Sequence, residues 1–243
     1  MRILSRLTHP ARIVAPELET IEQVDAFIDS RALEYAGRLE DALVERALAL
    51  GVGGGMVLDV GTRVGLIALK ILWHNENFYA IGIDRSSAMI ERARETAAAW
   101  GLGERAFFQV GDARRMRFKT AYFDLVISDS TLHCFDDPVS VLAEIGRVLK
   151  PKGALLIRDL QRPNHFTMAR QIGEHGAHYG SALRPYVEAA LRAAYTRAEL
   201  EGILRQSRLE RARLVELDKH YMAIERSGES DPNSWIKARE QYL

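Results

Sequence analysis

The 243-residue chain has a single cysteine, Cys134, and no excess of charge, since 33 basic residues balance 33 acidic ones. One cysteine excludes an internal disulfide framework and any metal site built from several cysteines. The balanced charge gives no general attraction to nucleic acid or to an anionic membrane. No apolar run approaches the length of a membrane span, and no signal-peptide pattern is present. These absences predict a globular cytoplasmic protein without a membrane segment.

The clearest local signal lies at residues 56–72, with the sequence MVLDVGTRVGLIALKIL. Its first residues form a short run that is apolar on both faces, which is typical of a buried parallel strand. Gly61 and Gly65 then bracket a tight turn, after which apolar residues recur at helical spacing. A bare turn before a helix lets a ligand approach the backbone, and the helix N-terminus offers unpaired N–H groups to an anion.

Strands alternate with helices along much of the chain. We expect further strands at 79–84, just before Asp112, at 123–128 and at 154–160, the last preceded by a helix from Pro138 to Leu149 and a PKG turn. This alternation predicts a parallel sheet with helices on both faces. Two more strand-like runs, 210–217 and 219–226, are too close in sequence to be parallel and predict a hairpin at one edge.

The chain divides into three predicted parts. Residues 1–50 form an N-terminal arm and helical cover, residues 51–226 one large α/β domain, and residues 227–243 a polar tail. Within the α/β domain, residues 161–195 lack strong periodicity, which is typical of a lid or a substrate-binding insertion.

Polar residues follow the ends of the predicted strands. Open parallel sheets bind ligands beyond the carboxyl ends of their strands. Asp84 is placed to accept hydrogen bonds from both hydroxyls of a ribose, and Asp112 could accept one from the exocyclic amine of adenine. The loop from Ser128 to His133 reaches the same edge of the sheet.

Five motifs together resemble the class I S-adenosylmethionine-dependent methyltransferases, specifically their small-molecule branch. The motifs are LDVGTRVG, GIDRSSAMIERAR, GDA, FDLVISDSTLHCFDDP and EIGRVLKPKGALLIRDL. The resemblance implies a Rossmann-like, seven-stranded, mostly parallel sheet with a C-terminal antiparallel hairpin. It also implies S-adenosylmethionine as the cofactor and in-line methyl transfer to a small-molecule acceptor, achieved mainly by positioning.

The resemblance also implies where the cofactor binds. The methionine part lies near the glycine turn, the ribose on Asp84, the adenine beside the GDA motif, and Ser128 under the sulfonium. The implied residues are Asp59, Gly61, Thr62, Arg63, Gly65, Asp84, Arg85, Met89, Asp112, Ala113 and Ser128. Arg63 departs from the family, which usually has glycine there. Its side chain either extends into solvent or pairs with a nearby carboxylate, and it could weaken cofactor binding.

His133 is the first candidate for a general base or for a group that orients the acceptor. Asp129 and Asp159, near strand ends, are candidates to bind a hydroxyl or an amine of the acceptor. Candidates for further substrate contacts are Arg158, Arg162, His165, His175 and Tyr179. The H-x-x-H spacing of His175 and His178 has no acid or cysteine to complete a site, so we expect no metal.

Other functions stay open. An NAD-dependent dehydrogenase also places an acid after its second strand, but it needs G-x-G-x-x-G where this chain has G-x-x-x-G. RNA methylation would use arginine-rich stretches near 114–119 and 205–213, although acids interleave the second stretch. A protein substrate, or a non-catalytic binding or regulatory protein on a degenerate methyltransferase fold, are further alternatives. The sequence leaves the oligomeric state open.

Overall fold

A single seven-stranded sheet organises the computed structural model, which describes residues 9–15, 25 and 30–229, with backbone only at 30–36 and 179–182. The strands are β1 Gly55–Val60, β2 Phe78–Asp84, β3 Ala106–Val110, β4 Phe123–Asp129, β5 Leu149–Leu160, β6 Arg213–Glu216 and β7 Tyr221–Arg226. Their order across the sheet is β3-β2-β1-β4-β5-β7-β6. All pairs are parallel except those of β7, which runs antiparallel to both β5 and β6.

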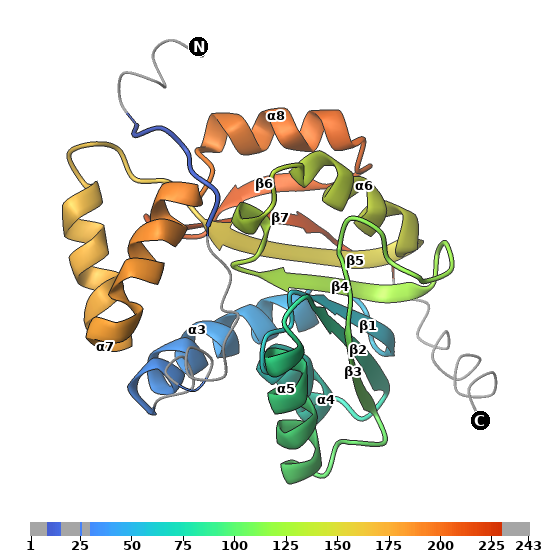
Figure 1. The fold of residues 1–243 in the computed structure, drawn as a ribbon. Helices are drawn as coiled ribbons and strands as arrows, with labels where there is room; N and C mark the ends of the chain where they lie inside the picture. The colour runs from blue at the N-terminus through green and yellow to red at the C-terminus, as the bar shows by residue number, and fades with distance from the viewer. Residues whose placement is uncertain (1–8, 16–24, 26–29, 230–243) are drawn as a thin grey trace.

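Helices cover both faces of the sheet (Figure 1). They are α3 Ser30–Leu48, α4 Leu66–His74, α5 Ser87–Ala99, the 3-10 turn η1 Leu132–Cys134, α6 Pro138–Val148, α7 Met168–Ala193 and α8 Arg197–Ser207. One apolar core joins the sheet to α3, α4 and α5, and a second joins its other face to α6 and α8. Successive residues of β1 enter alternate cores, because side chains alternate across a strand. The predicted fold class is confirmed.

The turn from β1 into α4 depends on backbone geometry that favours glycine. Gly61 and Gly65 have φ values of 73° and 82°, and Arg63 between them also has a positive φ of 52°. A Cβ atom at Gly65 would lie 2.6 Å from Cζ of Phe108, so the side chain of β3 packs directly against the turn. Glycine is therefore needed here for both conformation and space.

Several predicted boundaries need correction. β5 begins at Leu149, so the PKG segment lies inside an irregular first half of the strand and is not a turn. The hairpin strands β6 and β7 are shorter than the predicted runs because Leu217 and Asp218 form the turn with Tyr221. The helical cover predicted within residues 1–50 contains α3, whereas residues 16–24 and 26–29 of that region lie outside the described residues.

Local side chains cap the starts of two helices. Ser86 accepts a hydrogen bond from the Met89 amide at the start of α5. Thr196 and Glu199 form a capping box at the start of α8. Such caps satisfy backbone donors that a helix start leaves unpaired, and they depend only on residues three apart.

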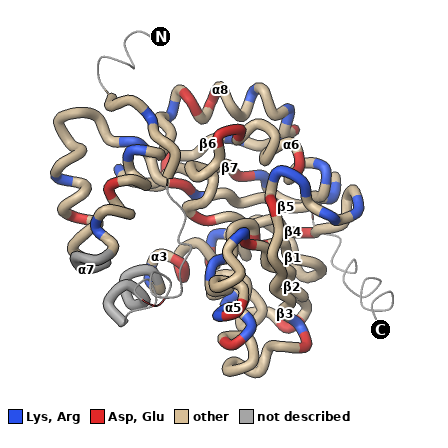
Figure 2. Tube along the Cα trace, viewed as in Figure 1, with Lys and Arg blue, Asp and Glu red and all other residues tan. Residues whose placement is uncertain are grey.

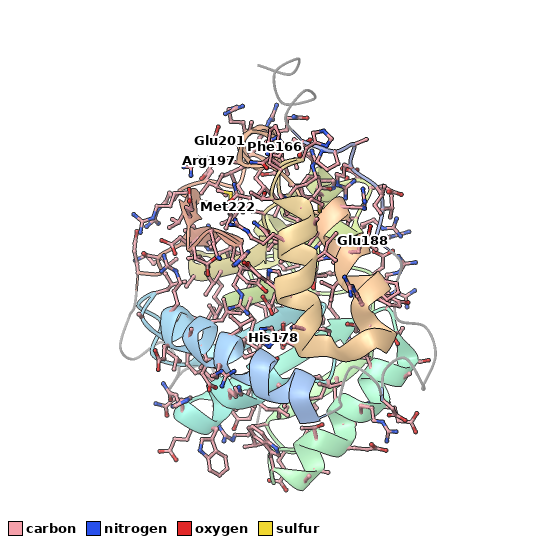
Figure 3. The ribbon with its side chains drawn as sticks, turned by 90° about the vertical axis from the view of Figure 1, so that its left-hand side faces the viewer. Phe166, His178, Glu188, Arg197, Glu201 and Met222 are labelled. Carbon is pink, nitrogen blue, oxygen red and sulfur yellow. The ribbon has the colours of Figure 1, made fainter. Side chains whose placement is uncertain are left out.

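The segment with weak periodicity, 161–195, is mostly helical. α7 contains Pro185 and turns back on itself, so that its two arms lie side by side (Figure 1). A Cβ atom at Gly176 would lie 3.4 Å from Cγ of Arg184, whereas eight residues of straight helix span about 12 Å. Figure 3 looks onto the two arms, with His178 near the bend and Glu188 on the returning arm.

We expect Gly65→Ala to lower the free energy of unfolding by about 3 kcal/mol, because the new methyl group meets the Phe108 ring at a positive φ. Gly101→Ala is the matched control, since Gly101 has a φ of 68° with no neighbouring atom within 4 Å. That control should cost about 1 kcal/mol from backbone strain alone. Urea denaturation measures both, and equal losses would show that contact with Phe108 is unimportant.

Candidate active site

A cavity of about 250 Å³ opens at the carboxyl ends of β1, β2, β4 and β5. Its wall is mainly apolar and is completed by α3, η1, α7 and Ala15 of the N-terminal arm. The predicted site residues that line it are Gly61, Arg63, Asp84, Arg85, Met89, Ala113, Asp129, His133, Arg158 and His175. Sheet topology therefore brings together residues more than 100 positions apart.

Asp84 lies at one end of the cavity. Its Oδ2 accepts a hydrogen bond from the Arg63 amide at 3.0 Å, and its Oδ1 accepts one from the Ser86 amide at 2.9 Å. Each carboxylate oxygen can accept a second bond. Ile83, Met89, Gly111 and Ala113 line the cavity beside it, so an apolar slot adjoins the acid.

Charged side chains form the cavity floor around Asp129. Arg158 Nε donates to Asp129 Oδ1 at 2.7 Å, and Arg63 Nη2 donates to Oδ2 at 2.9 Å. Burial disfavours the charge on Asp129, but the two guanidinium groups outweigh it and hold the pKa of this carboxyl below its ordinary value. Of the two placements open for Arg63, pairing with a carboxylate is confirmed.

Glu40 of α3 joins this floor. Its Oε1 lies 4.0 Å from Arg63 Nη2 and its Oε2 lies 3.3 Å from Lys70 Nζ. Burial raises the pKa of Glu40 in spite of these cations. Arg158 Nη1 also donates to the Leu39 carbonyl at 2.6 Å, so α3 is tied to β5 beside the acid.

His133 and Asp159 form a buried pair. His133 Nδ1 lies 2.6 Å from Asp159 Oδ1, and the His133 amide donates to Oδ2 at 2.9 Å. Burial opposes a charge on the imidazole, but the Asp159 carboxylate outweighs it and raises the pKa of His133 well above its ordinary value. A ring that is protonated at neutral pH is a hydrogen-bond donor, which favours an orienting role over that of a general base.

Arg12 of the N-terminal arm fastens the His133 loop from outside. Its Nη2 donates to the carbonyls of His133 and Phe135 at 2.7 and 3.0 Å, and its Nε donates to Ala193 at 2.7 Å. The guanidinium carbon also lies 4.2 Å from the centre of the Tyr195 ring. One arginine thus connects the arm, η1 and the end of α7.

The far end of the cavity is an apolar compartment under α7. Its wall includes Leu39, Phe135, Leu160, Leu183, Val187, Leu191 and Tyr221. His175 is buried there, 4.6 Å from the His220 ring, and its Nε2 has no hydrogen-bond partner among the described residues. Burial, with His220 nearby, lowers the pKa of His175 to about 4, so its ring is neutral at pH 7.

Other predicted site residues do not line the cavity. Asp59, Thr62 and Gly65 are absent from the lining, and Thr62 donates to Asp59 Oδ2 at 2.7 Å, where both side chains are buried. Ser128 donates to the Val60 carbonyl at 2.8 Å. Asp112 is paired with Arg114, which lowers the pKa of Asp112.

Only some of the residues predicted to contact the substrate line the cavity. Arg162 is buried between Glu199 and the Ala194 carbonyl, and His165 is exposed before α7, so neither is placed to touch a ligand in the cavity. The side chain of Tyr179 lies outside the described residues. Asp159 reaches the site through His133 and does not line the cavity itself.

Several lining residues were not predicted. Leu183, Val187 and Leu191 recur every four positions, and this spacing could have indicated one apolar helix face. Glu40, which also lines the cavity, and Arg12, which binds the His133 loop, could not have been found from local sequence patterns. Their partners are distant in the sequence.

The strand order, the bare turn after β1 and the acid that ends β2 define a Rossmann-like protein with a nucleoside-binding end. The chain belongs to the family of methyltransferase domains, whose family model matches residues 52–226. This membership confirms the predicted resemblance to class I S-adenosylmethionine-dependent methyltransferases. The predicted enzyme class and cofactor are those of the family.

Known relatives match part of the chain. A ubiquinone/menaquinone biosynthesis C-methyltransferase of Desulfotalea psychrophila is 36% identical over 111 residues, which cover 46% of this chain and 44% of that protein. A 27-O-demethylrifamycin SV methyltransferase of Amycolatopsis mediterranei is 31% identical over 106 residues, which cover 44% of this chain and 39% of that protein. The chain therefore spans about half the length of the curated relatives it matches.

A solved structure agrees on the fold. A SAM-dependent methyltransferase from Aquifex aeolicus superposes with a TM-score of 0.62 at 21% identity, covering 85% of this chain and 97% of that chain. No helix in the described ranges is both long and apolar enough to cross a membrane.

The buried acid Asp59 should make stability depend on pH. Burial raises the pKa of Asp59 to about 7, although the bond from Thr62 lowers it, whereas an unfolded aspartate titrates near 4. The unfolded chain therefore loses this proton first as pH rises. We expect a loss of stability on the order of 3 kcal/mol between about pH 4 and pH 7.

Asp59→Asn removes that titration and keeps an acceptor for Thr62. Urea denaturation should give the two proteins similar free energies of unfolding near pH 4. As pH rises, the free energy of unfolding of the wild type should fall relative to that of the variant. Parallel pH profiles for the two proteins would contradict the assignment.

Asp159→Asn should reverse the shift of the His133 pKa. Without the carboxylate, burial is the main remaining influence, so the pKa of His133 should fall below its ordinary value. Titration of labelled histidine by NMR measures this, with His133→Gln to identify the signal among the seven histidines. A His133 pKa that stays raised in Asp159→Asn would disprove the ion pair.

Proposed function

We propose that this chain transfers the methyl group of S-adenosylmethionine to a small, largely apolar acceptor. One observation carries the proposal: a single cavity connects the Asp84 end of the sheet to the apolar compartment under α7. A cofactor and an acceptor can therefore meet inside one cavity.

The residues at the Asp84 end fit an adenosine group. Asp84 keeps acceptor capacity on both oxygens for the two ribose hydroxyls, and the slot formed by Met89, Gly111 and Ala113 suits a flat ring. Gly61 lines the cavity, and a Cβ atom there would meet the Thr131 side chain, so the turn can pack against this loop only with glycine at this position.

The chain's contribution to catalysis is mainly positioning. When bound, the cofactor supplies an activated methyl group, so the protein has to align an acceptor atom with it and exclude water. α7 and the N-terminal arm cover the compartment, and the ion pairs at Asp129 hold its floor. The raised pKa of His133 supports its use as a charged donor to an oxygen of the acceptor.

An apolar acceptor is supported from two directions. The compartment wall is built mainly from leucine, valine and aromatic side chains. Relatives are named for ubiquinone or menaquinone biosynthesis and for a rifamycin substrate. A ring system bearing hydroxyl or carbonyl groups has the size and polarity that such a compartment would accept.

The alternatives receive less support. In the described part of the chain, Arg114, Arg211 and Arg213 are each paired with a carboxylate, which weakens the hypothesis of RNA binding. Figure 2 shows that α8 carries both acidic and basic positions. Arg63, whose side chain lines the cavity, is the observation that favours a non-catalytic protein on the same fold.

Isothermal titration with S-adenosylmethionine and S-adenosylhomocysteine tests the proposal, which expects micromolar binding. Asp84→Ala should raise both dissociation constants about tenfold or more, since charge-assisted bonds to the ribose are lost. Asp112→Ala is the comparison variant and should have a smaller effect, because Arg114 already occupies that carboxylate. No binding to the wild type at millimolar ligand would favour the non-catalytic alternative.

Methyl transfer is tested separately. Labelled S-adenosylmethionine should transfer its methyl group to members of a panel of apolar acceptors that includes demethylmenaquinone, and His133→Ala should slow turnover with near-normal cofactor binding. Equal activity of His133→Ala would reduce His133 to a structural role.

A further inference from the structure

Arg63 is bound to the Asp84 end through its backbone and to the cavity floor through its side chain. Its amide donates to Asp84 Oδ2 at 3.0 Å, and its Nη2 reaches Asp129 Oδ2 at 2.9 Å. The side chain is 22% exposed and lines the cavity. It therefore contacts any ligand that extends from Asp84 toward β4.

The order of strands sets the direction of such a ligand. β1 lies between β2 and β4, and β3 lies on the far side of β2. If a ribose binds Asp84 at the end of β2 and the adenine lies toward Gly111 and Ala113 after β3, the amino-acid part of the cofactor extends the other way. That direction leads across the β1 turn to the Arg63 guanidinium beside Asp129.

If the Arg63 side chain turned toward a new anion, Asp129 would keep a hydrogen bond from Arg158. Asp129 also accepts a 2.7 Å bond from Arg158 Nε, and Arg158 is held in turn by the Leu39 carbonyl. Exchanging Arg63 from Asp129 to a ligand carboxylate also moves it away from Glu40, but Glu40 Oε2 keeps Lys70 Nζ at 3.3 Å. Each buried acid thus keeps one cation, and the costly outcome of a wholly unpaired buried charge is avoided.

We propose that Arg63 binds the carboxylate at the amino-acid end of the cofactor, and so replaces the bare backbone usual at this position with a charged ligand contact. This inference rests on the proposed function. A guanidinium and a carboxylate form paired, charge-assisted hydrogen bonds, which suit recognition of this group. Arg63 is then a specificity residue for ligands that carry the carboxylate.

A cycle that changes both the protein and the ligand tests the inference. The variant is Arg63→Gly, because glycine adopts the positive φ of this position without strain. The probes are S-adenosylhomocysteine and its decarboxylated analogue, which keeps the amine. We expect Arg63→Gly to raise the dissociation constant of S-adenosylhomocysteine about tenfold or more, and that of the analogue by less than about twofold.

Two further variants separate charge from loop geometry. Arg63→Asn tolerates the same backbone conformation without a charge and should behave like Arg63→Gly, whereas Arg63→Lys should recover part of the affinity. Urea denaturation confirms that each variant is folded.

The outcomes distinguish the two proposals. Equal losses for both probes would overturn the carboxylate contact, and tighter binding by Arg63→Gly would show that Arg63 obstructs the cavity. Wild-type protein that binds both probes equally well defeats this inference alone. Failure of the wild type to bind either probe defeats the proposed function.

Discussion

The buried carboxylate of Asp129 is the constraint on which the site depends. It ends β4 and accepts hydrogen bonds from Arg63 of the β1 turn and from Arg158 of β5, while Arg158 also binds the Leu39 carbonyl of α3. A buried charge of this kind is stable only while at least one cation stays paired with it. The pairing therefore fixes the relative positions of four separate segments around the cavity.

The two ends of the cavity are built by different means. The Asp84 end consists of strand ends and a turn whose backbone conformations are set within the sheet. The far end needs α7 and the arm, which Arg12 fastens to η1 and to Ala193. The far end thus depends on α7 and the arm, whereas the Asp84 end depends mainly on the sheet and on the segments that directly follow its strands.

The packing of α7 near β7 leaves buried polar atoms without hydrogen-bond partners. Gln171 Oε1, His175 Nε2 and His220 Nδ1 are buried without hydrogen-bond partners among the described residues. Unpaired polar atoms lower the stability of packing. The returning arm differs, since Leu191 and Ala193 are fully buried and Arg12 binds the Ala193 carbonyl. The first arm of α7 is consequently the less stabilised part of the cavity wall.

Local sequence patterns determined the alternation of strands and helices, the glycine turn after β1, the caps at Ser86 and Thr196, and the acid that ends β2. These features depend on neighbouring residues, so periodicity and turn chemistry reveal them. Only the tertiary structure decided that Arg63 pairs with Asp129 and that Arg162 pairs with Glu199 away from the cavity. It also decided the contacts by which Glu40 and Arg12 help to build the site. Arg63 and Asp129 are 66 positions apart and Arg12 and His133 are 121 apart, so such contacts exist only once the sheet has brought distant strand ends together.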